Sequence, residues 1–164
     1  MKKRESGFTL IELLIVIAII GILAAIAIPN LLNAVQRGKQ KRTMADMRSF
    51  ATAIEAYAVD NNSYPAGSCA TGAFTTAGTA MSDTSLSILV PTYIAQPPRI
   101  DGWGRAMFYN VRGPAGQFDS YNLVSYGRDG SADTSIVCGT TTNFNNDIVY
   151  SDGSFLQWPE GSQQ

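Results

Sequence analysis

The feature that most constrains this chain is an apolar run near the N-terminus, residues 8–28, which contains a single charged residue, Glu12. A helix of these 21 residues is about 30 Å long, enough to cross the hydrocarbon core of a bilayer. A carboxylate inside such a segment costs on the order of 3 kcal/mol, so Glu12 is expected to need a cationic partner. The run predicts a membrane-spanning helix, and the alternative interpretation is an ordinary signal anchor with an isolated acid.

The segment before the run, residues 1–7, is a short basic leader that ends at Gly7. A secretory signal peptide starts in a similar way, but its apolar core is shorter and precedes the cleavage site. Here the candidate cleavage site lies between Gly7 and Phe8, so cleavage would remove the leader and retain the hydrophobic segment. Phe8 would then carry a new α-amino group four residues before Glu12. The carboxylate could pair with that amine or with the amine of a neighbouring subunit.

Apolar residues continue at helical spacing beyond this run and predict one long helix over residues 8–59, with 8–28 as its transmembrane and assembly segment. The apolar stripe of the second half is expected to pack on the sheet of its own domain, and it consists of Met47, Phe50, Ile54 and Tyr57. The turn-forming residues 60–64, followed by Pro65, are expected to end the helix.

Residues 60–164 are predicted to form a globular loop and sheet region. Strand-like runs separated by glycine-rich turns predict strands over residues 106–111, 121–126, 147–150 and 154–158. The dipeptide Asp152-Gly153 between the last two runs is typical of a two-residue hairpin. The predicted fold class is α+β, with one long helix packed on a small antiparallel sheet.

Composition narrows the possible functions. The formal net charge is −1, so the chain lacks the excess of basic residues that would indicate nucleic-acid binding. Histidine, the commonest general base, is absent. The sequence contains no nucleophile motif and no phosphate-binding loop. The chain is therefore predicted not to be an enzyme and to require no nucleic acid.

The two cysteines, Cys69 and Cys138, are too far apart in sequence for a redox pair or a zinc-binding pattern. They predict either a disulfide in an oxidising compartment or two buried free thiols. Basic residues flank both ends of the apolar run, so the positive-inside rule does not set the orientation. The leader must be reached by its peptidase, and cysteines suit an oxidising space, which favours a globular region outside the cytoplasm.

Three aspartates near the C-terminus, Asp129, Asp133 and Asp147, are candidate ligands for a hard cation, because calcium accepts carboxylate and carbonyl oxygens in irregular geometry. An EF-hand is not favoured, since its twelfth position would be Thr140 and no helices flank the loop. The alternative is three turn aspartates, which are common beside glycine.

The N-terminal residues resemble those of the type IV pilin superfamily. The resemblance implies that Gly7 and Phe8 form the prepilin peptidase site, that Phe8 becomes N-methylated, and that Phe8 and Glu12 act together in subunit assembly. It implies a pilin-like α+β fold and a single pass through the bacterial inner membrane, with the globular region in the periplasm. The implied partners are further copies of the chain in a helical homopolymer, the prepilin peptidase and N-methyltransferase, an inner-membrane assembly platform, and minor pilins or pseudopilins.

The rest of the chain resembles more specifically the major pseudopilin of type II secretion systems. Residues 60–65 are similar to its Asp-Asn-Gly-x-Tyr-Pro turn, and residues 101–104 to its Asp-Pro-Trp-Gly motif, with Gly102 in place of proline. Residues 125–130 and 147–148 look like its C-terminal calcium loop. The resemblance implies a bound calcium ion, with the side chains of Asp129 and Asp147 and the carbonyl of Tyr126 as ligands.

The expected function is therefore that of a structural subunit, the major pseudopilin of a short periplasmic filament that helps to drive folded proteins out of the cell. Two departures from the family pattern, the longer loop 131–146 and the longer C-terminal hairpin, keep an alternative open. In that alternative the chain is a type IV major pilin of surface fibres for adhesion, twitching motility or DNA uptake. A monomeric membrane-anchored binding module would require that the Gly7 cleavage does not occur.

Overall fold

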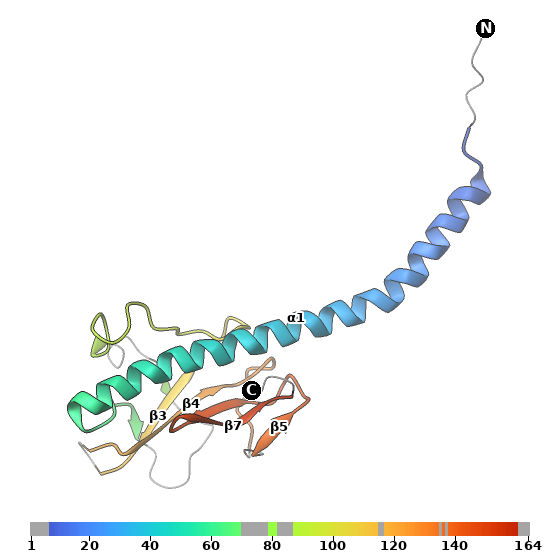
Figure 1. Cartoon of the computed structure of the whole chain (residues 1–164). Coiled ribbons are helices and arrows are strands. Elements are labelled where there is room, and N and C mark those ends of the chain that lie inside the picture. The colour runs from blue at the N-terminus through green and yellow to red at the C-terminus, as the bar shows by residue number, and fades with distance from the viewer. Residues whose placement is uncertain are drawn as a thin grey trace. The chain divides into compact units, whose positions relative to one another are not determined.

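The computed structural model describes residues 7–69, 79–81, 87–114, 117–134, 136 and 138–160. Most of the expected leader, residues 1–6, lies outside these ranges. The chain divides into two compact units, Met1–Arg37 and Gly38–Gln164. In the first unit the described residues after Thr9 form the start of helix α1, Leu10–Asn61, and the second unit contains the remainder of α1 and all strands (Figure 1).

Helix α1 begins and ends two residues later than the sequence pattern predicts. At its C-terminal end the Asn61 side chain donates to the carbonyl of Tyr57 at 2.9 Å, and Asn62 has a φ of 52°. A left-handed residue directly after the last turn is a common helix stop, and asparagine tolerates it better than most side chains. Pro29 lies within the helix, where its missing N–H removes one backbone hydrogen bond.

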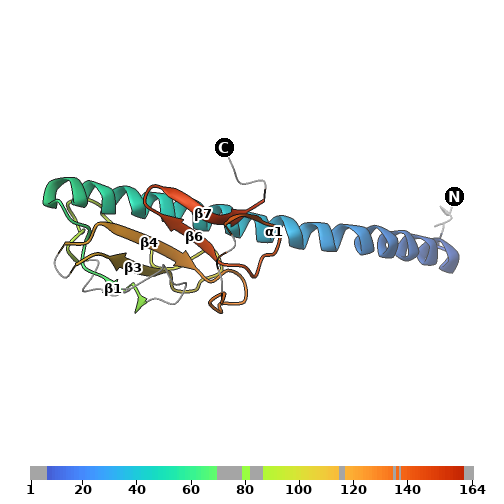
Figure 2. The same cartoon turned by 90° about the horizontal axis from the view of Figure 1, so that it is seen from below.

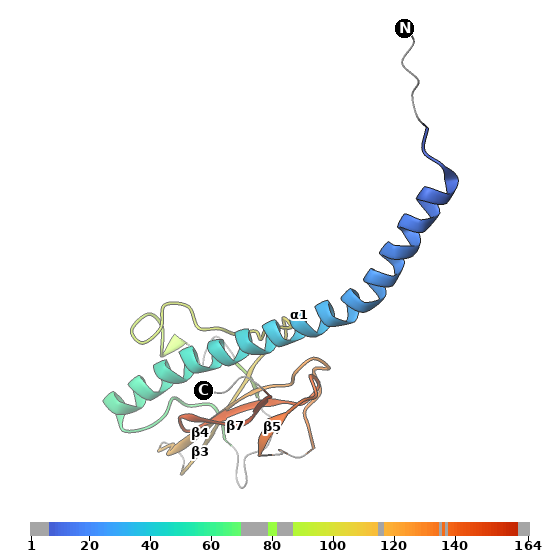
Figure 3. The same cartoon turned by 45° about the vertical axis from the view of Figure 1, so that its right-hand side comes forward.

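The sheet of the second unit has the strand order β1-β3-β4-β6-β7-β5, and β2 also pairs with β3. The strands are β1 Ser68–Cys69, β2 Thr79–Ala80, β3 Phe108–Arg112, β4 Ser120–Ser125, β5 Gly139–Thr141, β6 Ile148–Ser151 and β7 Ser154–Pro159. Figure 2 shows β3, β4, β6 and β7 side by side next to the second half of α1, and Figure 3 shows β5 beside β7.

The sheet is mixed, whereas the sequence predicts an antiparallel one. The pairs β3·β4, β4·β6 and β6·β7 are antiparallel, as predicted, although only β3·β4 and β6·β7 are joined by short connections. The short edge strands differ, because β1 runs parallel to β3 and β5 runs parallel to β7. A long stretch of chain separates the two partners of each parallel pair, and such a separation permits parallel pairing that a tight turn forbids. The α+β class and the pilin-like arrangement of one long helix over a small sheet are confirmed.

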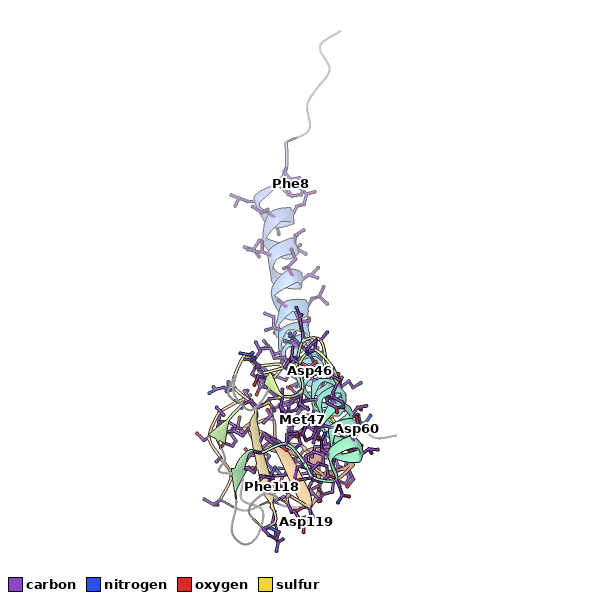
Figure 4. The ribbon with its side chains drawn as sticks, turned by 90° about the vertical axis from the view of Figure 1, so that its left-hand side faces the viewer. Phe8, Asp46, Met47, Asp60, Phe118 and Asp119 are labelled. Carbon is purple, nitrogen blue, oxygen red and sulfur yellow. The ribbon has the colours of Figure 1, made fainter. Side chains whose placement is uncertain are left out.

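The core lies between the second half of α1 and one face of the sheet, as the apolar stripe predicts. Met47, Phe50 and Ile54 of α1 are at most 1% exposed, and they belong to one cluster with the sheet residues Tyr109, Val111, Tyr121, Leu123 and Ile148. Figure 4 shows Met47 within this layer of side chains. Burying each side chain of this size contributes about 2 kcal/mol, so the stripe fixes this part of α1 on the sheet.

Two turns secure the ends of the core. Asp152 and Gly153 join β6 to β7 with φ values of 45° and 87°, which confirms the predicted two-residue hairpin. At the end of α1, the amide of Tyr64 donates to the carbonyl of Phe118 at 3.0 Å, and the amide of Phe118 donates to Ser63 Oγ at 2.9 Å. The residues that follow α1 are thereby tied to the loop between β3 and β4, which contains Phe118 and Asp119 (Figure 4).

Candidate functional site

The first candidate site is the start of the N-terminal unit, where Gly7, Phe8 and Thr9 precede α1 (Figure 4). Glu12 Oε2 accepts hydrogen bonds from the Thr9 amide at 2.8 Å and from Thr9 Oγ1 at 2.6 Å. Thr9 Oγ1 in turn accepts from the Glu12 amide at 3.4 Å. This is a capping box, in which a threonine and a glutamate three residues later satisfy each other's backbone donors at a helix start.

The capping box gives Glu12 a local role that the sequence analysis did not include. The signal was present, because threonine at position 9 and glutamate at position 12 have the capping-box spacing. Both residues are exposed in the isolated chain, so the carboxylate remains accessible to a cation from outside the helix. Phe8 is 76% exposed and lies four residues before Glu12.

The rest of the N-terminal unit is an apolar helix surface. One 18-residue window of α1 has a mean hydropathy of 3.0, and none of that window is buried. By length and composition this helix can cross a membrane. Its large exposed side chains are Leu10, Ile11, Leu13, Leu14, Ile15, Val16, Ile17, Ile19, Ile20, Ile22, Leu23, Ile26, Ile28, Leu31, Leu32 and Val35. A continuous apolar surface of this kind has to be covered by lipid or by other protein chains.

The second candidate site is the acidic loop, residues 126–147, between β4 and β6. Asp133 and Asp147 bind each other's backbone. The Asp133 amide donates to Asp147 Oδ2 at 3.0 Å, and the Asp147 amide donates to Asp133 Oδ2 at 2.9 Å. Asp147 is fully buried, and its second oxygen, Oδ1, has no hydrogen-bond partner in the described part of the chain.

The electrostatics of Asp147 follow from this position. Burial raises the pKa of the Asp147 carboxyl to about 7. The Asp133 amide opposes that increase by its hydrogen bond, whereas the negative charges of Asp133 and Asp129 add to it. A buried carboxylate oxygen without a donor is costly, and a proton or a cation would remove the cost.

The predicted calcium ligands differ in how the structure places them. Asp147, the last residue of the acidic loop, is hydrogen-bonded to Asp133, which the sequence analysis kept only as a candidate. Asp129 is exposed, and its Oδ1 accepts the Ser131 amide at 3.0 Å in a local turn. The carbonyl of Tyr126 accepts the Gly130 amide at 3.2 Å. Within the described ranges no three acidic, cysteine or histidine side chains converge, so a cation here would need carbonyl or water oxygens as well.

Residues 101–104, which the sequence analysis matched to a family motif without assigning them a role, have a structural role. Asp101 is 1% exposed and accepts the amides of Trp103 and Arg105 at 2.8 and 2.9 Å, and Ser125 Oγ at 2.7 Å. The Gly102 amide donates to Thr43 Oγ1 on α1 at 2.8 Å. The motif thus joins the end of β4, just before the acidic loop, to the helix.

The strand order disfavours the predicted disulfide. Cys69 is in β1 and Cys138 directly precedes β5, and these strands are at opposite ends of the sheet with four strands between them. Five strand spacings amount to about 24 Å, whereas a disulfide needs Cα atoms about 5 to 6 Å apart. Cys138 is an exposed free thiol. The side chain of Cys69 lies outside the described residues, so the pairing stays a prediction that the topology does not support.

Comparison with known proteins identifies the family of the chain. Residues 30–143 match the sequence model of the family described as type II secretion system (T2SS), protein G, and residues 2–28 match the prokaryotic N-terminal methylation motif. The chain is 36% identical over 133 residues to the type II secretion system core protein G of Aeromonas hydrophila, covering 81% of this chain and 90% of the relative. It is 30% identical over 155 residues to the protein of that name in Pseudomonas aeruginosa, covering 87% and 99%.

A second kind of relative shares a shorter region. The type IV major fimbrial protein FimA of Dichelobacter nodosus is 50% identical to this chain over 72 residues, which is 44% of this chain and 45% of the relative.

Proposed function

Because this chain belongs to the type II secretion system protein G family, we propose that it is the major pseudopilin of such a system. In this role many copies form a short periplasmic filament that helps to drive folded proteins across the outer membrane. The observation that carries the proposal is the first part of α1, an apolar helix surface that is not buried by any of the described residues. A second copy of the same helix is a partner of matching chemistry.

The N-terminal unit supports a defined order of events. The leader holds the chain in the inner membrane until a prepilin peptidase cuts between Gly7 and Phe8, and N-methylation of Phe8 follows. The apolar helix is first covered by lipid and later by the same helix of other subunits. Glu12 pairs with the Phe8 amine of a neighbouring subunit, since two opposite charges in a low-dielectric environment cost far less together than apart.

The remaining partners and the location follow from the same role. The helix crosses the inner membrane once, and the globular unit is in the periplasm. An inner-membrane assembly platform adds the subunits, and minor pseudopilins start the filament. The chain is a substrate of processing enzymes and is not itself an enzyme.

Calcium binding at the acidic loop is part of the proposal. The buried Asp147 Oδ1 without a hydrogen-bond donor supports it, because a divalent cation would neutralise that oxygen. When bound, the cation would supply charge neutralisation only. The chain's contribution is to hold the end of β4 and the start of β6 together around it.

The alternative function, a type IV major pilin of surface fibres, has two observations in its favour. One is the 50% identity over 72 residues to the fimbrial protein of Dichelobacter nodosus. The other is the β6·β7 hairpin, with the parallel strand β5 at its side, which extends the sheet beyond β4.

Deletion of the gene in its source bacterium distinguishes the two functions. The pseudopilin proposal predicts loss of protein secretion, with surface fibres and twitching motility unchanged. Loss of the fibres with intact secretion would overturn it and select the pilin. Complementation with Glu12→Gln serves as a matched variant, because glutamine preserves the capping box and removes the charge.

A further inference from the structure

The interlocked pair Asp133 and Asp147 joins two segments that are 14 residues apart in sequence. Each carboxylate accepts the backbone amide of the other residue, at 2.9 and 3.0 Å. This reciprocal arrangement holds each carboxylate against the backbone of the other residue. One of the two residues, Asp133, belongs to the long loop 131–146, which is a departure from the family pattern.

The pair leaves one buried carboxylate oxygen without a hydrogen-bond partner among the described residues. Asp147 is fully buried, its Oδ2 is used by the Asp133 amide, and its Oδ1 has no donor within the described residues. Asp147 also forms no ion pair with a lysine or arginine in that part of the chain. Two adjacent carboxylates of which one is removed from water attract a positively charged oxygen-binding ion.

A buried side chain also contacts the second carboxylate. Gln157 of β7 is 1% exposed, and its Nε2 donates to Asp133 Oδ2 at 3.4 Å. Gln157 belongs to the C-terminal hairpin, so the hairpin contributes one contact to Asp133. Asp129 has no comparable support, since it is exposed and its Oδ1 is used by the Ser131 amide.

We propose that Asp133, positioned by Gln157, replaces Asp129 as the second carboxylate ligand of the cation at Asp147. The inference rests on the proposed calcium site and assigns its ligands in this chain. The loop 131–146 then supplies a ligand, and the C-terminal hairpin orients it. In this chain the two departures from the family pattern form parts of one cation site.

The test compares Asp129→Asn with Asp133→Asn in the full-length protein in detergent. Asparagine keeps a side-chain oxygen at both positions, so the amides of Ser131 and Asp147 retain an acceptor. Calcium affinity is measured by isothermal titration, and terbium luminescence sensitised by the nearby aromatic rings gives a second readout. Asp133→Asn is expected to weaken binding by roughly tenfold or more, whereas Asp129→Asn stays within about threefold of the wild type.

A measurement on the unmodified protein covers the case in which Asp133→Asn fails to fold. The carboxyl ¹³C resonances of Asp133 and Asp147 are expected to shift on calcium addition, and that of Asp129 is expected to stay in place. Wild-type binding that depends on Asp129 and not on Asp133 would overturn the ligand assignment and leave the calcium proposal intact. Absence of calcium and terbium binding by the wild type would overturn both.

Discussion

Gly102→Ala tests the contact between the residues 101–104 and α1. A methyl group at this position would overlap the backbone carbonyl oxygen of Lys39 and would lie 2.8 Å from its carbon and 2.9 Å from Lys39 Cα. These are backbone atoms of a helix and cannot rotate away, so Gly102 itself has to move. That movement stretches its 2.8 Å hydrogen bond to Thr43 Oγ1.

The magnitude follows from two contributions. Overpacking a well-packed site costs about 1 to 3 kcal/mol, and weakening a partly buried backbone hydrogen bond adds about 1 kcal/mol. We expect Gly102→Ala to lower the free energy of unfolding by about 3 kcal/mol. At about 4 °C per kcal/mol for a unit of this size, the midpoint of thermal unfolding falls by about 12 °C.

The assay is thermal unfolding of the full-length protein in detergent, followed by near-ultraviolet circular dichroism. Gly38→Ala is the matched control, because Gly38 lies in α1 and an added methyl meets no atom within 4 Å. Alanine is the better helix former, so the control is expected to be neutral or to gain up to about 1 kcal/mol. A Gly102→Ala midpoint within about 2 °C of the wild type would refute the packing argument.

Three further predictions follow from the same structure. In the presence of chelator, the raised pKa of Asp147 means that this carboxyl binds its proton more tightly in the folded state than in the unfolded state. The protonated carboxyl therefore contributes its full stabilisation below about pH 4, and this contribution is lost as the pH rises through about 7. Compared with Asp147→Asn, the wild type should lose on the order of 3 kcal/mol over that range in denaturant titrations, and parallel pH profiles would contradict this. Asp101→Ala removes the acceptor of three hydrogen bonds and should lower the free energy of unfolding by roughly 4 kcal/mol. Asp101→Asn should lower it by less than half as much, and equal losses for the two variants in urea unfolding would contradict this prediction. Glu12→Gln should insert and be processed normally but give few filaments in a shearing assay, and wild-type filament yield would show that assembly does not need the charge of Glu12.

Much of the fold could be predicted because its periodic signals are strong. The apolar run and the Met47, Phe50 and Ile54 stripe specified a single helix and the face that it buries. The Asp152-Gly153 dipeptide specified the last hairpin through the backbone conformation that it favours. The edge strands β1 and β5 could not be predicted, because two or three residues carry no periodicity and their pairing depends on long connections.

The candidate sites were predictable to different degrees. Gly7, Phe8 and Glu12 were apparent from local sequence, and the capping box at Thr9 was present in the same few residues. The proposed preference for Asp133 over Asp129 rests on contacts with Asp147 and with Gln157, which is 24 residues away in sequence. The role of Gly102 depends on its contacts with Lys39 and Thr43 of α1, and a sequence pattern does not predict contacts between residues so far apart in sequence.

Electron cryomicroscopy of the filament formed by this chain tests the central claim most directly. We predict subunits that begin at an N-methylated Phe8, with the apolar segment 8–35 bundled in the filament core. The Phe8 amine should lie within about 4 Å of the Glu12 carboxylate of a neighbouring subunit. Subunits that retain residues 1–7, or apolar segments that face solvent in the assembled filament, would contradict the account.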